Sequence, residues 1–354
     1  MTVGISLLTL VPGVVGGSET YARELVRALR RVGGLDYRVF KPTIVEDVEG
    51  ETIRSYPARR TSRGRVFAMA RTAVAPGSTR RELRLEDLDA IHFPLTVMLP
   101  RVDDPPAAVS LLDIQHILFP EFFSRAELAY RRLVYGWSLR RARTVIAISQ
   151  HVKETLVERL DVDAERIEVI HLGLDHALFH PNGTEAKRPF LLYPANPWPH
   201  KNHERLFEAF TRVRRARPEL RLILTGTGLE RLGGVPAGVD VRGRVARDEL
   251  AELYRMASAL IFPSLYEGFG QPPLEAMASG TPVAVSRAGS LPEVCGDAAF
   301  YFEPTSVEEI AEAIVAVLDR SDQLIQRGLA RASKFTWDET ARRHDEVYRA
   351  LAAA

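Results

Sequence analysis

Cysteine is nearly missing from this 354-residue chain, and Cys295 is its single example. One thiol cannot form an internal disulfide, and it cannot supply a cysteine-rich zinc site. So little cysteine suits a reducing compartment, and we therefore expect a cytoplasmic protein.

Long apolar runs are also absent. The one apolar stretch near the N-terminus, residues 1–17, has no basic start and is interrupted by Pro12 and Gly13. It predicts a buried strand and a turn, not a signal peptide. No uninterrupted apolar run reaches the roughly 18 residues that a membrane-spanning helix needs, so none is expected.

An excess of charge of one sign is missing as well, because 47 Lys and Arg residues face 46 Asp and Glu residues. Without a strong net field there is no general attraction to nucleic acid, and we expect no nucleic-acid partner. The length exceeds what one typical core supports and suits two domains.

What the chain does contain is an alternation of apolar runs and amphipathic segments. The first unit is a strand, a glycine loop and a helix, with Ser18 as the expected N-cap and Gly33 as the stop. A later helix is expected to start near Ser149. Further strands are predicted at AIHF, AAVSLL, TVIAIS and IEVIHL. Such alternation favours a parallel sheet covered on both faces, which binds ligands at the carboxyl ends of its strands.

The alternation is broken once, by a polar stretch with Pro and Gly at residues 176–189, where we place a linker. Strands and helices then resume, beginning with FLLYPAN and ERLFEAFTRVRRA. We expect a Rossmann-like domain over 1–180, a second one over 181–335, and a final helix over 336–354 that packs back on the first.

The stretch FPSLYEGFGQPPLEAMASGTPVAVS, residues 262–286, places Glu267 and Glu275 on either side of a tight turn. Pro272 and Pro273 suit the first turn of a helix. Glu267 is then expected at a strand's carboxyl end and Glu275 in the first turn of the helix, where free N–H groups favour a phosphate. Spacing alone also allows a plainer arrangement, with Glu275 complementing the helix dipole and Glu267 as a turn residue.

This block resembles the donor-site signature of retaining glycosyltransferases of family 4, and the resemblance covers nearly the whole chain. It includes GVVGGSETYARELVRAL, YPANPWPHKNHERLFEAF and LILTGTG. The family has the α/β GT-B fold, in which two Rossmann-like parallel-sheet domains face each other across a cleft. DIQHILFPEFFS and PWPHKNH are most similar to bacterial mannosyl- or rhamnosyltransferases that build surface polysaccharides.

The resemblance implies roles for the residues of the 262–286 block. Glu275 would accept hydrogen bonds from the ribose hydroxyls of the nucleotide, and Glu267 would hold hydroxyls of the donor sugar. The backbone expected to line the sugar and the diphosphate belongs to Gly268, Phe269, Gly270 and Gln271.

Lys201 lies near a helix start, where a cation is disfavoured unless a diphosphate is bound there. The family pairs this lysine with an arginine a few residues earlier, and here that position is Asn196, with His200 available to compensate. Gly16 and Gly17 permit close backbone approach to a ligand. The resemblance places their loop beside the donor phosphates and the acceptor.

His116 is the predicted active-site histidine. Many members of the family carry that histidine just before an aspartate, where this chain has Leu112, whereas His116 follows Asp113 by three residues. The competing choice is His92, at the end of a predicted strand.

The predicted reaction is transfer of a hexose from a nucleotide sugar to a hydroxyl of a glycan or lipid-linked acceptor, with retention of configuration. GDP-mannose is the first choice of donor, and a UDP-sugar is close behind. The nucleotide sugar is a substrate, so no cofactor is expected, and Lys201 would stabilise the leaving diphosphate without a metal. Two alternatives use the same donor site: an epimerase-like enzyme without an acceptor, and a degenerate transferase that only binds nucleotide sugars.

The arginine-rich stretch over residues 59–84 has an apolar centre. It predicts peripheral contact with the cytoplasmic face of the inner membrane, a site that holds a lipid-diphosphate acceptor, or a solvated helix face with a loop.

Overall fold

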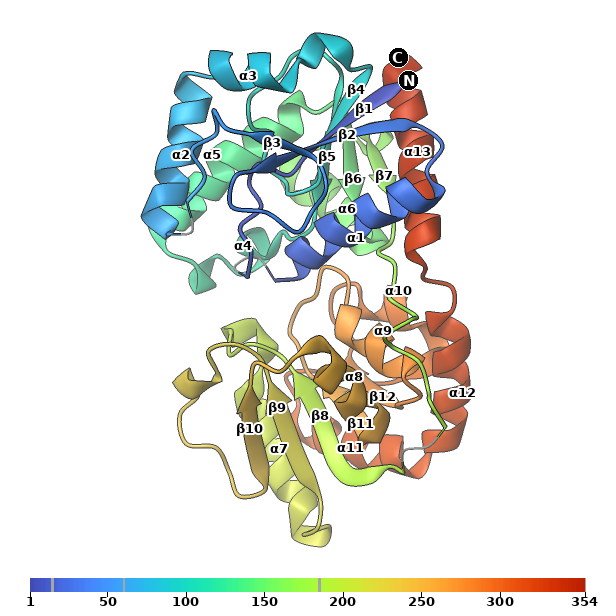
Figure 1. The fold of residues 1–354 in the computed structure, drawn as a ribbon. Helices are drawn as coiled ribbons and strands as arrows, with labels where there is room; N and C mark the ends of the chain where they lie inside the picture. Colours follow the sequence, from blue (N-terminus) through green and yellow to red (C-terminus); the bar gives the residue numbers. More distant parts are fainter. Residues whose placement is uncertain (14–15, 60, 184–185, 354) are drawn as a thin grey trace. The chain divides into compact units, whose positions relative to one another are not determined.

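The computed structural model describes residues 1–13, 16–59, 61–183 and 186–353 (Figure 1). The chain divides into two compact units, one of Met1–Gly173 with Trp337–Ala354 and one of Leu174–Thr336. This division falls shortly before the expected linker at 176–189, of which residues 184–185 lie outside the described part. Each unit contains one all-parallel sheet flanked by helices.

The first unit is built on a seven-stranded sheet in the order β3-β2-β1-β4-β5-β6-β7. Its strands are β1 (Thr2–Ser6), β2 (Asp36–Pro42), β3 (Glu51–Ile53), β4 (Ala90–Phe93), β5 (Ala107–Leu111), β6 (Thr144–Ala147) and β7 (Ile167–Val169). Every residue of β4 and β5 is buried. Parallel strands are covered on both faces, which explains why these two read as continuous apolar runs in the sequence.

Helices cover the first sheet. They are α1 (Gly17–Val32), α2 (Ser62–Val74), α3 (Gly77–Leu83), α4 (Gln115–Leu118), α5 (Arg125–Arg141), α6 (Gln150–Leu160) and α13 (Trp337–Ala353). The expectation that Ser18 caps α1 is wrong. Gly16 is the cap, with φ 54° and no side-chain hydrogen bond, so the helix starts one residue before Ser18. The helix ends at Val32 with Gly33 as its C-cap, so Gly33 stops it as expected.

Helix α13 belongs to the first unit although it comes from the far end of the sequence. It packs along α1 (Figure 1). Trp337, Ala341 and Tyr348 share one buried cluster with Tyr21 and Leu25. The last helix thus completes the core that β1 and α1 begin.

The second unit is built on a six-stranded sheet in the order β10-β9-β8-β11-β12-β13. Its strands are β8 (Arg188–Pro194), β9 (Arg221–Thr225), β10 (Val239–Gly243), β11 (Ala257–Phe262), β12 (Val283–Ser286) and β13 (Ala299–Phe302). Its helices are α7 (His203–Ala216), α8 (Arg247–Met256), α9 (Gln271–Ala278), α10 (Leu291–Cys295), α11 (Val307–Asp319) and α12 (Ser321–Ala332).

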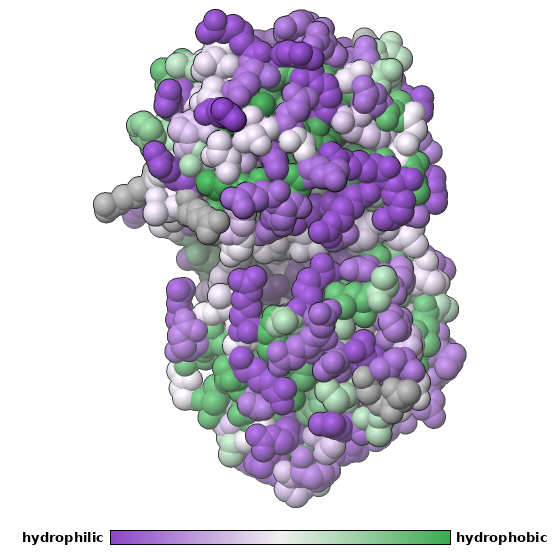
Figure 2. All heavy atoms as spheres, viewed as in Figure 1, coloured by the Kyte–Doolittle hydropathy of each residue, from purple (hydrophilic) through white to green (hydrophobic). Residues whose placement is uncertain are grey.

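The face of the molecule seen in Figure 2 is dominated by hydrophilic residues, with apolar ones dispersed among them. Among the described residues, no helix combines the length and the apolar character needed to cross a membrane.

Candidate functional site

The order of the second sheet has one switch point. From β8 the chain builds outward through β9 and β10, and then it returns to the other side of β8 with β11. In open parallel sheets ligands bind outside the carboxyl ends of the two strands at such a point. Lys201 follows β8 and Glu267 follows β11, so both residues stand where the topology places a ligand.

Lys201 and Glu267 form an ion pair, with 2.6 Å between Nζ and Oε1. Their side chains are only 16% and 13% exposed, so the pair is shielded from water but not sealed. The Lys201 ammonium also lies 5.5 Å from the centre of the Phe262 ring. The two charged groups are therefore already held together before any ligand arrives.

The loop that carries Lys201 is fixed by Asn202. This residue has φ 59°, and its side-chain amide donates to the carbonyls of Pro263 (3.0 Å) and Pro304 (2.7 Å). The Tyr193 hydroxyl donates to the Lys201 carbonyl at 2.5 Å. These bonds tie the end of β8 to the end of β11 and set the position of the lysine.

Glu267 is held from the next loop along the sheet. Both the backbone N–H (3.1 Å) and the hydroxyl (3.0 Å) of Ser290 donate to the Glu267 carbonyl. The backbone of the glutamate is thereby fixed, while its carboxylate remains directed at Lys201.

Glu275 lies in the second turn of α9, and the expectation of a first-turn position is wrong. The helix begins at Gln271 and its first turn contains no acid, because Gln271, Pro272 and Pro273 fill it. The Tyr254 hydroxyl donates to Glu275 Oε2 at 2.9 Å. Burial raises the pKa of Glu275 to about 7, against the lowering influence of the Tyr254 hydrogen bond and of Arg247.

The start of α9 offers fewer amide donors than an ordinary helix start. Gly270 is the cap at φ 100°, and a Cβ there would lie 2.6 Å from Leu291 Cδ2. Pro272 and Pro273 occupy two of the positions whose N–H groups a helix leaves unbonded, and proline has no N–H, so two donors of an ordinary helix start are missing here. Phe269 is buried and packs edge-on against Phe335, so only its backbone can face a ligand.

Asn196, at the position where the resemblance implies an arginine, joins two loops. Its Oδ1 accepts from the Thr227 N–H at 2.7 Å, which links the loop after β8 to the loop after β9. His200 does not replace the missing cation. Burial first, and then Lys201, lower the pKa of His200 to about 3, so the ring is neutral near pH 7.

Gly16 and Gly17 lie at the carboxyl end of β1 and the start of α1, and both are exposed. A Cβ on either residue would meet nothing within 4 Å. Glycine is favoured at position 16 because the backbone there has a positive φ. Space does not require glycine at either position, because no neighbouring atom would touch a Cβ. The open space beside them is consistent with a ligand approaching the backbone.

His116 is buried in α4, with its ring edge-on to Tyr135 (5.5 Å between centroids) and Phe123 (6.4 Å). Burial, followed by the charges of Arg131 and Arg132, lowers the pKa of His116 to about 4. The imidazole is therefore neutral near pH 7 and could exchange hydrogen bonds, but it would not carry a charge.

His92 is unsuited to the role of active-site histidine. Its ring is fully buried, and its two nitrogens are bonded to Tyr348 (2.7 Å) and Ser110 (2.8 Å). Both hydrogen-bonding positions are used inside the core of the first unit, so the ring has none to offer a substrate.

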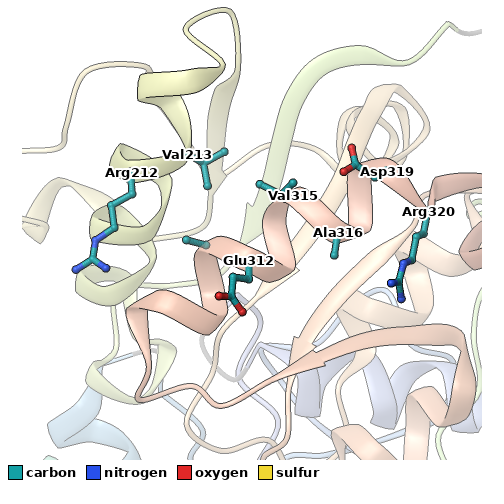
Figure 3. Close-up of a pocket in the computed structure, with 8 residues that line it drawn as sticks. Arg212, Val213, Glu312, Val315, Ala316, Asp319 and Arg320 are labelled. Atoms are coloured by element: carbon teal, nitrogen blue, oxygen red, sulfur yellow. The ribbon is translucent and has the colours of Figure 1, made fainter.

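The described residues outside this site offer little further chemistry. In the described part of the chain, no group of three or more His, Cys, Asp or Glu side chains is placed to hold a metal ion. A groove of about 520 Å³ lies between α7 and α11 (Figure 3). Its lining, which includes Arg212, Glu312 and Arg320, contains none of the predicted donor-site residues.

Asn202, Ser290 and Tyr254 were not identified from the sequence. Each acts on a predicted site residue through a contact that is distant in sequence, and such contacts leave no local pattern. The one available signal was Asn202 itself, because asparagine directly before a helix tolerates the left-handed backbone found there.

Comparison with known proteins identifies both halves of the chain. Residues 15–178 match the family described as Glycosyltransferase Family 4, and residues 176–331 match Glycosyl transferases group 1. O-antigen chain mannosyltransferase B of Escherichia coli is 29% identical over 268 residues, which are 69% of this chain and 70% of the relative. MMP alpha-(1->4)-mannosyltransferase of Mycolicibacterium hassiacum is 32% identical over 58% of this chain and 53% of its own.

Solved structures agree on the fold. Sucrose-phosphate synthase from Thermosynechococcus elongatus has a TM-score of 0.77 at 20% identity, covering 100% of this chain and 99% of that one. WaaG, a glycosyltransferase of lipopolysaccharide biosynthesis, has a TM-score of 0.73 at 17% identity, with 98% and 99% covered. Anabaena HepE in complex with UDP-glucose has a TM-score of 0.71 at 20% identity, with 99% and 100% covered. This chain is therefore a glycosyltransferase of family 4, within the glycosyl transferases group 1, and it has the GT-B fold.

Proposed function

We propose that the protein transfers a hexose from a nucleotide sugar to a hydroxyl of a glycan or lipid-linked acceptor, with retention of anomeric configuration. The observation that carries the proposal is the Lys201–Glu267 ion pair at the switch point of the second sheet. One cation and one carboxylate side by side match two adjoining parts of a bound nucleotide sugar, its diphosphate and its sugar hydroxyls.

In this mechanism donor binding divides the ion pair. The diphosphate takes the Lys201 ammonium, and Glu267 turns to the hydroxyls of the donor sugar. The bond between the anomeric carbon and the phosphate oxygen breaks while the acceptor oxygen bonds to the same face of that carbon. The acceptor's proton passes to the departing phosphate oxygen. Lys201 stabilises the negative charge that grows on the diphosphate, so the step needs no covalent enzyme nucleophile.

Mannose is the proposed sugar, and GDP-mannose is the proposed donor. Its support is the group of mannosyltransferases among the relatives of this chain. A UDP-sugar is the next choice, because the fold is shared with Anabaena HepE, whose structure is a complex with UDP-glucose. Glu275 is proposed to accept the ribose hydroxyls of either nucleotide.

The first unit is proposed to serve the acceptor. Neutral His116 would hydrogen-bond near the transferred sugar, and the Gly16–Gly17 loop would present its backbone to the phosphates and the acceptor. Asn196 is proposed to shape the loop around the phosphates and not to neutralise them, because its Oδ1 is bonded to Thr227.

The proposal is tested first by nucleotide binding and then by sugar transfer to an acceptor. Thermal unfolding is followed with GDP-mannose, UDP-glucose, GDP and UDP, without divalent metal, for wild type and Glu275→Ala. A ligand at a hundred times its Kd adds about 2.7 kcal/mol of stability. One nucleotide class should stabilise wild type and fail to stabilise the variant. If no nucleotide stabilises the folded wild type, the proposal is wrong.

Turnover is then measured with the stabilising donor and a synthetic octyl α-mannoside, and NMR of the product identifies its anomeric configuration. A product of inverted configuration would reject the retaining mechanism while leaving the donor assignment intact. Consumption of the donor without glycoside formation, whatever the acceptor offered, would favour the epimerase-like alternative.

We also propose that the first unit rests peripherally on an anionic membrane surface through α2 and α5. Phe67 and Val74 on α2 and Leu133 on α5 are 62%, 86% and 71% exposed. The two helices are joined where the Tyr130 hydroxyl contacts Met69 Sδ at 3.4 Å. Exposed apolar side chains among arginines favour an anionic interface.

Co-flotation tests this surface with vesicles of phosphatidylglycerol or phosphatidylcholine. Wild type should float with the anionic vesicles only, and the Phe67→Ser/Leu133→Ser variant should lose that binding. Equal behaviour of the two proteins would show that this surface is merely solvated. Arg60, part of the basic stretch identified from the sequence, lies outside the described residues.

A further inference from the structure

Glu275 is supported by a buried tyrosine that no sequence motif marked. Tyr254 lies on α8 with its side chain fully buried, and its hydroxyl donates to Glu275 Oε2 at 2.9 Å. The Phe179 ring packs edge-on against the tyrosine ring, with 5.8 Å between centroids. A phenol enclosed in this way has no freedom to leave the carboxylate.

The backbone of Tyr254 is fixed as well. The hydroxyl of Thr281 donates to the Tyr254 carbonyl, and the Lys187 ammonium donates to that same hydroxyl at 2.7 Å. Thr281 directly follows the turn that ends α9, the helix that carries Glu275. The tyrosine and its glutamate are therefore held to each other at both main chain and side chain.

Two further charged groups act on Glu275. Arg247 lies two turns before Tyr254 on α8, and it pairs with Asp175 at 3.6 Å. The arginine favours the charged carboxylate, whereas the aspartate opposes it. These two influences on the pKa of Glu275 have opposite signs, and each is smaller than burial or the Tyr254 hydrogen bond.

We propose that Tyr254 is a positioning residue for donor binding, which fixes one oxygen of Glu275 and aims the other at the ribose of the nucleotide. This inference rests on the proposed function, because it assumes that Glu275 accepts the ribose hydroxyls. Its physical basis is that an acceptor oriented in advance loses less entropy when it bonds a ligand. Oε2 is bonded by the tyrosine, so Oε1 remains the acceptor directed at the ligand.

A pH dependence follows from the same contact. Burial raises the pKa of Glu275 to about 7, and the tyrosine hydrogen bond opposes that rise. Tyr254→Phe removes the opposing contact, so the pKa of Glu275 rises further and the carboxylate protonates at higher pH. A protonated carboxyl is a weaker acceptor for ribose hydroxyls. As the pH is lowered, the variant should therefore begin to lose nucleotide affinity at a higher pH than wild type does.

The experiment compares GDP with 2′,3′-dideoxy-GDP by isothermal titration calorimetry, or the uridine pair if UDP is the nucleotide that binds. Wild type should prefer the ribonucleotide, and Tyr254→Phe should reduce this preference about three- to tenfold, which lies within the range of one ordinary hydrogen bond. The midpoint of its affinity against pH should move upward.

Tyr301→Phe is the matched control. It removes another tyrosine hydroxyl from the second unit, one that donates to the Gly296 carbonyl and has no contact with Glu275. Its ribose preference and pH midpoint should equal those of wild type. Thermal unfolding of each variant shows whether it is folded before its affinities are interpreted.

Glu275→Ala, which removes the acceptor, separates the two levels of the argument. If this variant keeps the full ribose preference, Glu275 does not bind ribose and the proposed donor site is wrong. If Glu275→Ala loses the preference while Tyr254→Phe keeps it and the wild-type pH midpoint, the donor site stands and the role of Tyr254 is refuted. Should Tyr254→Phe fail to fold, Arg247→Gln takes its place, because Arg247 also opposes the rise in the pKa of Glu275. The quantity measured is again the pH midpoint of nucleotide affinity. An unmoved midpoint there would show that the contacts around Glu275 do not tune it, which refutes the inference.

Discussion

Single residues at the site take their positions from contacts that link loops far apart in the sequence. Lys201 and Glu267 are 66 positions apart, yet they are joined at 2.6 Å because β8 and β11 are neighbours in the sheet. Placing Glu267 at the end of a strand and Lys201 near the start of a helix was possible from the sequence. Their ion pair was not predictable, because it depends on the strand order.

Lys201→Ala should lower kcat about 10²- to 10³-fold, as expected for removal of one preorganised donor that stabilises a developing anion. The variant also leaves Glu267 shielded from water without its partner. Lys201→Ala/Glu267→Gln should therefore recover folding stability but not activity. Steady-state kinetics and urea unfolding measure the two effects. An unchanged kcat in the single variant would exclude Lys201 from the transition state.

Asn202 offers a second test at the residue scale. Asn202→Gly keeps the left-handed backbone but removes the donor to two buried carbonyls, which should cost about 1–3 kcal/mol of unfolding free energy. Asn202→Ala should cost about 1 kcal/mol more, because alanine disfavours φ near 59°. Equal stability of the two variants, measured in urea, would argue against backbone strain at this position.

At the scale of elements, the buried strands β4, β5 and β8 were predictable, as was the edge strand β7, whereas β3 and β10 were not. β4, β5 and β8 bury most of their residues and stand out as apolar runs. β3 and β10 lie at sheet edges and bury few of their residues, so these residues carry neither a continuous apolar run nor a clean alternation. Propensity alone could not identify them, because the neighbouring strand determines their pairing.

The start of α9 depends on Gly270, and this can be tested against Gly280 at the other end of the helix. Both have positive φ, 100° and 72°, but a Cβ at Gly280 meets only Pro181 at 3.5 Å. Gly280→Ala should cost about 1–2 kcal/mol through the backbone alone. Gly270→Ala should cost more, because its Cβ also collides with Leu291. Chemical unfolding compares the pair, and equal losses would rule out the collision.

On the scale of the whole molecule, α13 is secured to the first unit by a chain of neutral hydrogen bonds. The Thr340 carbonyl can only accept, so His344 Nδ1 carries the proton and Nε2 accepts from the Tyr21 hydroxyl. The Tyr21 oxygen in turn accepts from Ser110 at 2.7 Å. Each hydrogen bond fixes which group donates in the next one. This order of donors therefore requires the His344 ring and the Tyr21 hydroxyl to be uncharged.

His92 and Tyr348 extend this arrangement to the sheet. Ser110 accepts from His92 Nε2, and His92 Nδ1 accepts from the Tyr348 hydroxyl. Burial lowers the pKa of His344 to about 4 and that of His92 well below its ordinary value. Both rings are therefore neutral in the folded protein near pH 7.

Stability should accordingly fall in acid. Between about pH 6.5, where histidine in the unfolded chain titrates, and the lowered pKa values in the folded state, the unfolded chain binds more protons. The unfolding free energy then declines by about 1.4 kcal/mol per pH unit for each histidine as pH falls. His344→Gln should reduce that slope, whereas His180→Gln, at an exposed position, serves as the control. Urea unfolding at several pH values measures the slopes, and identical slopes would contradict the argument.

The sequence separation of α13 from the strands that it covers affects protein synthesis. Residues 337–353 leave the ribosome only after all of Leu174–Thr336, so the first unit waits with the face of α1 uncovered while the second unit emerges. The second unit is continuous in sequence and can fold as it appears, although it is made later. Maturation should therefore run opposite to the usual order, with the N-terminal unit finished last. A ribosome-stalled chain ending near residue 336 should protect the second unit from protease and leave the first one sensitive.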